Sequence, residues 1–203
     1  MQLVGMLDSP YVRRVAITAQ FLGIPYEHNP LSIFKSYDEF RKLNPLVKVP
    51  TLICDDGEML VDSSLIIVHL QSLSGDDNAL MPQDGAAKRR ALQLTGVALV
   101  AKDKMVQIIY ETRQRPAELV HQPWIDRVAQ QLRSAFEILE AAVGDGESWL
   151  FGDSPTVADI SIAVAWRFSQ LTSAERVQEV DYPGLVRFSA RAEALPQFRA
   201  CPL

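Results

Sequence analysis

The chain has 203 residues, of which 48% are hydrophobic and 22% charged, the composition of an ordinary globular protein. Its formal net charge of −5 argues against a nucleic-acid partner, and no apolar run is long enough for a membrane span. We see no basic leader before an apolar segment and expect a cytoplasmic protein. Cys54 and Cys201 fit neither a disulfide framework nor a metal-ligand spacing, so we expect no metal.

The beginning of the chain predicts a βαβ unit. Residues 2–6 are short and apolar like a strand, and apolar residues at helical spacing predict a helix over residues 10–22 that ends at Gly23. A second extended segment follows at residues 26–30. Because a helix separates the two strands, we expect them to be parallel.

A short helix and a hairpin follow. Ser36 and Glu39 have the Ser-x-x-Glu spacing of a capping box, which predicts a helix from there to about Leu43. Two apolar segments, residues 51–54 and 58–61, flank the Asp-Asp-Gly turn, a pattern typical of an antiparallel hairpin.

The polarity pattern changes after residue 74. Ser63 and Ser64 offer caps for a third helix over about residues 65–73, which completes a β-α-β-α-β-β-α order. A polar cluster without periodicity then predicts a linker. We therefore expect a mixed domain at residues 1–74, a linker at 75–84 and a second domain at 85–203.

The sequence of the second domain predicts an entirely helical structure. Long amphipathic helices are predicted at about residues 86–113 and 124–143, and a last one at about 183–194. Between them, Thr156 and Asp159 form a capping box before a helix that is apolar on nearly every side, which is typical of the buried centre of a bundle.

Four motifs in this order, DSPYVRR, NPLVKVPTL, VDSSLI and FGDSPTVADI, resemble those of the cytosolic glutathione S-transferase family, in particular bacterial members with serine at the catalytic position. The resemblance covers essentially the whole chain. It implies an α/β thioredoxin-like N-terminal domain, an all-α helical-bundle C-terminal domain and a homodimer.

Ser9 is the catalytic candidate. It precedes Pro10, which favours the first helical position, so Ser9 is the expected N-cap beside unpaired backbone N–H groups. The resemblance implies that its hydroxyl donates to the glutathione sulfur. Lowering a thiol pKa of ~8.5 by about two units corresponds to about 2.7 kcal/mol. A hydrogen bond to a charged acceptor contributes roughly 1.5 to 3 kcal/mol and a helix N-terminus roughly 0.3 to 2 kcal/mol, so the two suffice without a general base.

The resemblance also implies the glutathione-binding residues. A cis peptide between Val49 and Pro50 would pair the Val49 backbone with the cysteinyl backbone of glutathione. Lys48 would face the glycyl carboxylate. Asp62 stands where the family usually has glutamate and would meet the γ-glutamyl ammonium, while Ser63 would bind the γ-glutamyl carboxylate.

The cysteines argue against two related chemistries. Ser9 and Val12 align with the two cysteines of the C-x-x-C motif of thioredoxins and glutaredoxins, which argues against dithiol exchange and against the single-cysteine chemistry of omega-like and beta-like transferases. We interpret Cys54 as a small hydrophobic residue inside a core strand.

The function implied is a detoxification transferase that activates glutathione as a thiolate and adds it to hydrophobic electrophiles, with glutathione as co-substrate and no other cofactor. Two alternatives stay open: a non-catalytic binding or assembly module with the same fold, and a glutathione-dependent isomerase or peroxidase. Met105, Ile108 and Tyr110 could contact the acceptor, although a place in the bundle core is the favoured interpretation for each.

Overall fold

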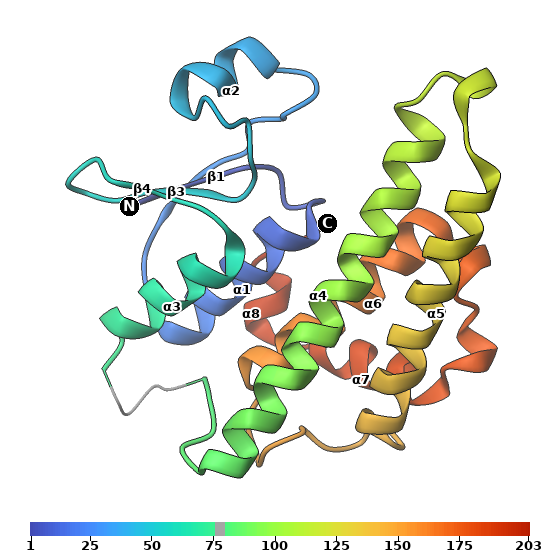
Figure 1. The fold of residues 1–203 in the computed structure, drawn as a ribbon. Coiled ribbons are helices and arrows are strands. Elements are labelled where there is room, and N and C mark those ends of the chain that lie inside the picture. Colours follow the sequence, from blue (N-terminus) through green and yellow to red (C-terminus); the bar gives the residue numbers. More distant parts are fainter. Residues whose placement is uncertain (76–79) are drawn as a thin grey trace. The chain divides into compact units, whose positions relative to one another are not determined.

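The computed structural model describes residues 1–75 and 80–203. The described residues form short strands, the helices that Figure 1 labels and single turns of 3₁₀ helix: β1 (Gln2–Val4), α1 (Pro10–Leu22), β2 (Glu27–Asn29), α2 (Tyr37–Leu43), β3 (Thr51–Ile53), β4 (Met59–Leu60), α3 (Ser63–Leu73), α4 (Gly85–Arg113), η2 (Ala117–Leu119), α5 (Gln122–Val143), α6 (Val157–Ser173), η3 (Ala174–Arg176), η4 (Glu179–Asp181), α7 (Pro183–Glu193) and α8 (Pro196–Arg199).

The N-terminal unit is a four-stranded mixed sheet covered by helices. The strand order is β2-β1-β3-β4, with β1 parallel to β2 and antiparallel to β3, and β3 antiparallel to β4. Helices α1 and α3 pack together on one face, and α2 lies on the other (Figure 1). This arrangement confirms the predicted element order and the thioredoxin-like fold.

Helix α1 has the local signals that the sequence predicts. Ser9 is its N-cap in an extended conformation, Pro10 occupies the first helical turn, and Gly23 ends it with φ 66° and ψ 23°. A glycine suits that left-handed conformation because it has no β-carbon. The apolar side of the helix is buried, as Val12 and Val15 illustrate with 0% and 1% exposure.

Two capping predictions are wrong in detail. Helix α2 begins after Ser36, but the Ser36 side chain makes no capping hydrogen bond, because its backbone (φ −125°, ψ 41°) lacks the extended conformation of a typical N-cap. Helix α3 begins at Ser63 rather than at residue 65, and its N-cap is Asp62, whose Oδ1 accepts from the Ser64 backbone N–H at 2.9 Å.

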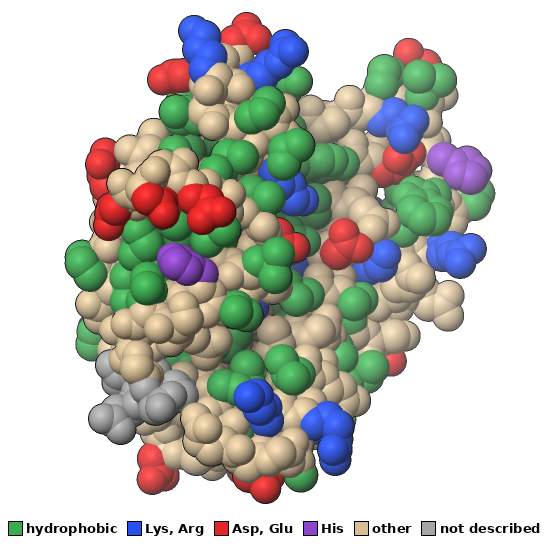
Figure 2. Space-filling view, turned by 60° about the vertical axis from the view of Figure 1, so that its left-hand side comes forward, with side chains coloured by type: hydrophobic (Ala, Val, Ile, Leu, Met, Phe, Trp, Pro, Cys, Tyr) green, Lys and Arg blue, Asp and Glu red, His purple; other side chains and the backbone are tan. Residues whose placement is uncertain are grey.

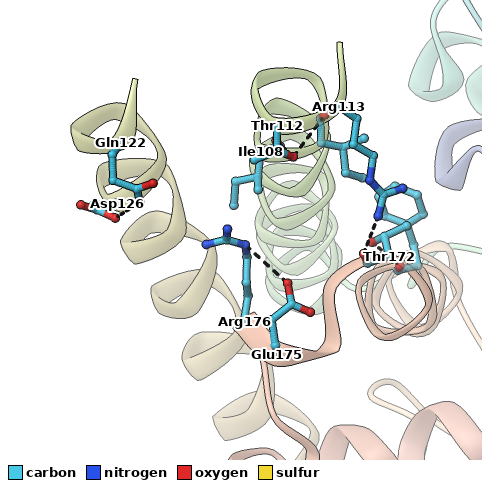
Figure 3. A network of polar contacts seen from close by, with 10 residues as sticks. Ile108, Thr112, Arg113, Gln122, Asp126, Thr172, Glu175 and Arg176 are labelled. Carbon is cyan, nitrogen blue, oxygen red and sulfur yellow. Dashed lines mark hydrogen bonds and ion pairs between the residues drawn. The ribbon is translucent and has the colours of Figure 1, made fainter. Parts of the chain in front are cut away.

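The C-terminal unit is a helical bundle, as predicted, with α6 buried at its centre. The Thr156 capping box is confirmed, because its backbone N–H donates to Asp159 Oδ2 at 2.8 Å. At one end of the bundle Arg113 Nη2 donates to the Thr172 backbone oxygen at 2.9 Å, which ties the end of α4 to the end of α6 (Figure 3).

Residue contacts group the chain into two units, Met1–Leu80 with Ala194–Leu203, and Met81–Glu193. The last segment joins the first unit because Arg13 on α1 donates from Nε to the Cys201 backbone oxygen at 2.9 Å and stacks over Phe198 at 5.7 Å. The boundaries predicted from the sequence stay a prediction. Part of the predicted linker, residues 76–79, lies outside the described residues.

Candidate functional site

Ser9 lies at the start of α1, half-buried, where the backbone N–H groups of the first turn have no partner within the helix. Its Oγ accepts from the Val12 backbone N–H at 3.5 Å, which is long for a hydrogen bond. A hydroxyl has one proton and two lone pairs, so this contact leaves the Ser9 proton available for an anion. The N-cap position is confirmed, whereas the catalytic role stays a prediction.

Gly5 brings the loop before α1 close to Val49. Gly5 has φ +131°, and a β-carbon there would lie 2.6 Å from Val12 Cγ2 and 3.0 Å from Val49 Cγ1. Only glycine fits both the backbone angle and this approach. Two of the predicted site segments, the one with Ser9 and the one with Val49, are therefore neighbours.

The segment that carries Lys48 and Val49 is held by Asn44. The Asn44 amide is buried and donates from Nδ2 to Thr51 Oγ1 at 2.8 Å, while its Oδ1 accepts from the Leu46 backbone N–H at 2.9 Å. Thr51 Oγ1 in turn donates to the Lys48 backbone oxygen at 2.6 Å. Sequence reasoning missed Asn44, although it opens the motif NPLVKVPTL.

The bond between Val49 and Pro50 is cis, as the resemblance implies, and so is the bond between Val61 and Asp62. The Lys48 side chain is exposed, so it is accessible to an anion. Asp62 is also exposed, whereas Ser63 is buried, with 2% exposure. The accessible groups at the start of α3 are therefore the Asp62 carboxylate and the half-buried Ser64.

Arg14 is a further residue of this region, and sequence reasoning gave it no role. Its side chain is buried, and its Nη1 donates to Ser63 Oγ at 3.0 Å and to Ser64 Oγ at 3.1 Å. Burial lowers the pKa of Arg14 to about 10, against the opposing influence of Asp62 and Tyr11. The guanidinium is still charged at neutral pH. The only sequence signal was a charged pair inside a helix that is otherwise largely apolar.

Neither cysteine has the environment of a reactive thiolate. Cys54 lies just after β3, half-buried, which corrects its predicted place inside a core strand. Its Sγ is 3.8 Å from His69 Nε2. Burial and the acidic residues of the hairpin turn, Asp56, Glu58 and Asp55, raise its pKa. Figure 2 shows a group of acidic side chains close together on the surface that it presents. Burial also raises the pKa of Cys201.

The residues considered for the acceptor divide into two groups. Met105 and Ile108 are buried in α4, with 0% and 2% exposure, which confirms the favoured core interpretation, whereas Tyr110 is 44% exposed. A groove of about 690 Å³ lies between α4 and α5 and contains none of the predicted glutathione-binding residues. Among residues 1–75 and 80–203, no cluster of three or more His, Cys, Asp or Glu side chains could hold a metal ion.

Comparison with known proteins identifies the class. The family model of the glutathione S-transferase N-terminal domain matches residues 3–78, and that of the C-terminal domain matches residues 122–191. Maleylacetoacetate isomerase of Pseudomonas aeruginosa is 33% identical, over 98% of this chain and 94% of that protein. An uncharacterized GST-like protein of Escherichia coli, YibF, is 28% identical over 92% of this chain and 91% of its own length.

Solved structures agree with the sequence comparison. A glutathione S-transferase of Methylobacterium radiotolerans, in complex with glutathione sulfonate, has a TM-score of 0.90 and 27% identity, covering 98% of this chain and 93% of that one. Another from Methylobacillus flagellatus, with glutathione bound, has a TM-score of 0.89 and 25% identity, covering 100% and 99%. The chain belongs to the glutathione S-transferase family.

Proposed function

We propose that this protein is a glutathione transferase in which the Ser9 hydroxyl stabilises the thiolate of bound glutathione for attack on a hydrophobic electrophile. The observation that carries the proposal is the position of Ser9 at the start of α1, with its proton available and the helix N-terminus beside it. A thiolate held there would accept a hydrogen bond from the Ser9 hydroxyl. A hydrogen bond to a charged acceptor supplies much of the free energy that is needed to lower the pKa of the thiol.

The rest of the tripeptide would extend from Ser9 to the start of α3. Val49 offers its backbone to the cysteinyl group beside the cis bond to Pro50, and the exposed Lys48 offers a cation to the glycyl carboxylate. At the other end, Asp62 would bind the γ-glutamyl ammonium and Ser63 the adjoining carboxylate. The close approach of Val49 to Gly5 supports this assignment, because it brings the segments together.

We further propose a cytoplasmic homodimer that uses glutathione as co-substrate, with no other cofactor. No helix in the described part of the chain is long and apolar enough to cross a membrane. Exposed apolar side chains on α4 and α5, including Val100 and Ile138, border the groove between these helices and offer a surface for a second copy. Light scattering coupled to gel filtration would measure the mass in solution and so decide between a monomer and a dimer.

Calorimetric titration with glutathione tests the main proposal. Saturable binding is expected, together with turnover of an aromatic halide in the presence of glutathione. A folded protein that binds no glutathione would instead be the non-catalytic module. Because binding and turnover are measured separately, a protein that binds glutathione without any turnover is also recognised.

A glutathione-dependent isomerase is the second candidate, because the Pseudomonas aeruginosa maleylacetoacetate isomerase is 33% identical over nearly the whole chain. Against it, the Asp8-Ser9-Pro10 turn differs from the Ser-Ser-Cys turn that the isomerase branch usually shows. Incubation of the protein with maleylacetoacetate and catalytic glutathione separates the two activities. An isomerase converts the substrate without consuming glutathione, whereas a transferase consumes glutathione in proportion to the conjugate formed.

A further inference from the structure

Arg14 is a buried cation without an ion pair. Its side chain is 1% exposed, and within the part of the chain that the structure describes its guanidinium forms no salt bridge and its Nε has no hydrogen-bond partner. Its hydrogen-bond partners are two neutral hydroxyls, those of Ser63 and Ser64. Asp62 attracts this charge without a direct ion pair. A buried charge whose hydrogen-bond partners are neutral is costly, and an apolar side chain would join α1 to α3 at lower cost.

The hydrogen bonds to Arg14 fix how the two serines are oriented. A hydroxyl has one proton to donate and two lone pairs, and a guanidinium can only donate. Because Ser63 Oγ and Ser64 Oγ both accept from Arg14 Nη1, at 3.0 and 3.1 Å, neither can turn its proton toward the guanidinium. Both protons must point elsewhere, so each hydroxyl is prepared to donate to an acceptor on the side away from Arg14.

The start of α3 supplies further attraction for a negative group. Its first backbone N–H groups carry the positive end of the helix dipole, and α3 has 11 residues. One of these N–H groups, that of Ser64, already donates to Asp62 Oδ1. The positive charge of Arg14 lies within hydrogen-bond distance of both hydroxyls and adds to the attraction of the helix N-terminus for a negative group. A carboxylate at this place would therefore receive donors that are already aligned.

We propose that Arg14 is the positioning residue of the γ-glutamyl carboxylate subsite, where it aligns the Ser63 and Ser64 hydroxyls as donors without touching the ligand. Ser64 thereby becomes a second hydroxyl of the subsite, the more accessible one because Ser63 is only 2% exposed. The inference deepens the proposed function and rests on it. It also helps to explain why a charge is buried there, since the ligand carboxylate would be a second distant counter-ion beside Asp62.

The test compares two ligands, glutathione and the analogue that lacks the γ-glutamyl α-carboxylate, γ-aminobutyryl-cysteinyl-glycine. Dissociation constants of both are measured by calorimetry for the wild type and for Arg14→Met. We expect Arg14→Met to weaken glutathione roughly tenfold, in line with the loss of about one charge-assisted hydrogen bond, and to weaken the analogue less than about twofold. In the kinetics, KM for glutathione rises while kcat at saturation stays near the wild-type value.

If Arg14 serves only to link α1 to α3, the experiment should give a different result. Arg14→Met would then weaken both ligands by the same factor, and that outcome overturns the inference, as does an unchanged affinity for glutathione. Wild-type protein that binds neither ligand overturns the proposed function itself. Wild-type binding with equal losses in the variant refutes the role of Arg14 alone, so the two failures are distinguishable.

Matched variants separate the effect of the Arg14 charge on ligand binding from an effect on folding. Arg13→Met removes the neighbouring buried guanidinium, which contacts Cys201 and Phe198, and should lower stability without discriminating between the ligands. Arg14→Lys keeps the cation and should give an intermediate loss for glutathione only. If Arg14→Met does not fold, Arg14→Lys and Ser64→Ala carry the comparison: equal losses for both ligands in these variants count against the inference.

Discussion

Val49 Cγ1 lies 3.0 Å from the position that a β-carbon on Gly5 would occupy. This approach fixes the segment that precedes Ser9 against the segment that is proposed to bind the cysteinyl backbone of glutathione. Position 5 therefore controls the geometry of the candidate site although it carries no side chain.

Gly5→Ala should reduce both stability and glutathione affinity. The new methyl group would lie 2.6 Å from Val12 Cγ2, and a positive φ in a non-glycine residue costs about 1 to 3 kcal/mol. We expect urea denaturation to show a loss of more than about 1 kcal/mol. Gly57→Ala is the matched control, because Gly57 also has a positive φ but nothing within 4 Å of its added β-carbon. Equal losses in both variants would show that the close approach at Gly5 has no importance.

Ser9→Ala should slow conjugation most at neutral pH. Loss of one hydrogen bond to a charged acceptor, roughly 1.5 to 3 kcal/mol, corresponds to about a 10- to 150-fold slower reaction. The pKa of the bound thiol should rise toward ~8.5, so the defect should narrow as the pH approaches that value. Rates across this pH range, with thiolate absorbance of the complex, measure both effects. Ser9→Thr keeps a hydroxyl and should retain most of the rate, and a fully active Ser9→Ala would remove Ser9 from the mechanism.

Asp159→Ala should lower stability and leave the chemistry unchanged. Asp159 accepts from the Thr156 backbone N–H at 2.8 Å and from the Leu150 backbone N–H at 2.9 Å, so its removal leaves two donors without this acceptor. Loss of such a cap typically costs about 0.5 to 2 kcal/mol. Thermal unfolding and the kinetic constants are the measurements. Asp153→Ala removes an exposed acid from the same loop and should have little effect. An equal loss in both variants would contradict the capping role.

Glu111 should make stability depend on pH. Its Oε1 accepts from the His121 backbone N–H at 3.0 Å and pairs with Arg115 Nε at 2.9 Å. The bond from His121, followed by those from Arg115, lowers the pKa of Glu111, although desolvation acts in the opposite direction. A lowered pKa means that the ionised form stabilises the folded state above the ordinary glutamate value of 4.5, and that this contribution disappears as the pH falls through the folded pKa.

The measurement for Glu111 is chemical denaturation of the wild type and of Glu111→Gln over a range of pH. The difference in stability should be constant above pH 4.5 and should shrink as the pH falls below it. Glu118→Gln changes an exposed acid nearby and should show no such trend. A difference that grows in acid would contradict the lowered pKa.

The sequence by itself determined the features that depend on neighbours along the chain. The N-cap of α1 at Ser9, its end at Gly23, the β3–β4 hairpin and the Thr156 capping box were all predicted, because a cap or a turn is decided by residues two to four positions apart. The capping box predicted at Ser36 did not form, since the backbone angles at that residue are unsuitable.

The tertiary structure decided how these local elements meet. Arg14 and Ser63 are 49 positions apart, so no local pattern could reveal that a buried guanidinium orients the hydroxyls at the start of α3. For the same reason, the sequence did not predict that the segment around Cys201 packs against Arg13 on α1. A charged side chain in a sequence indicates exposure by default, and only its partners in space show that this one is buried and what it can hold in place.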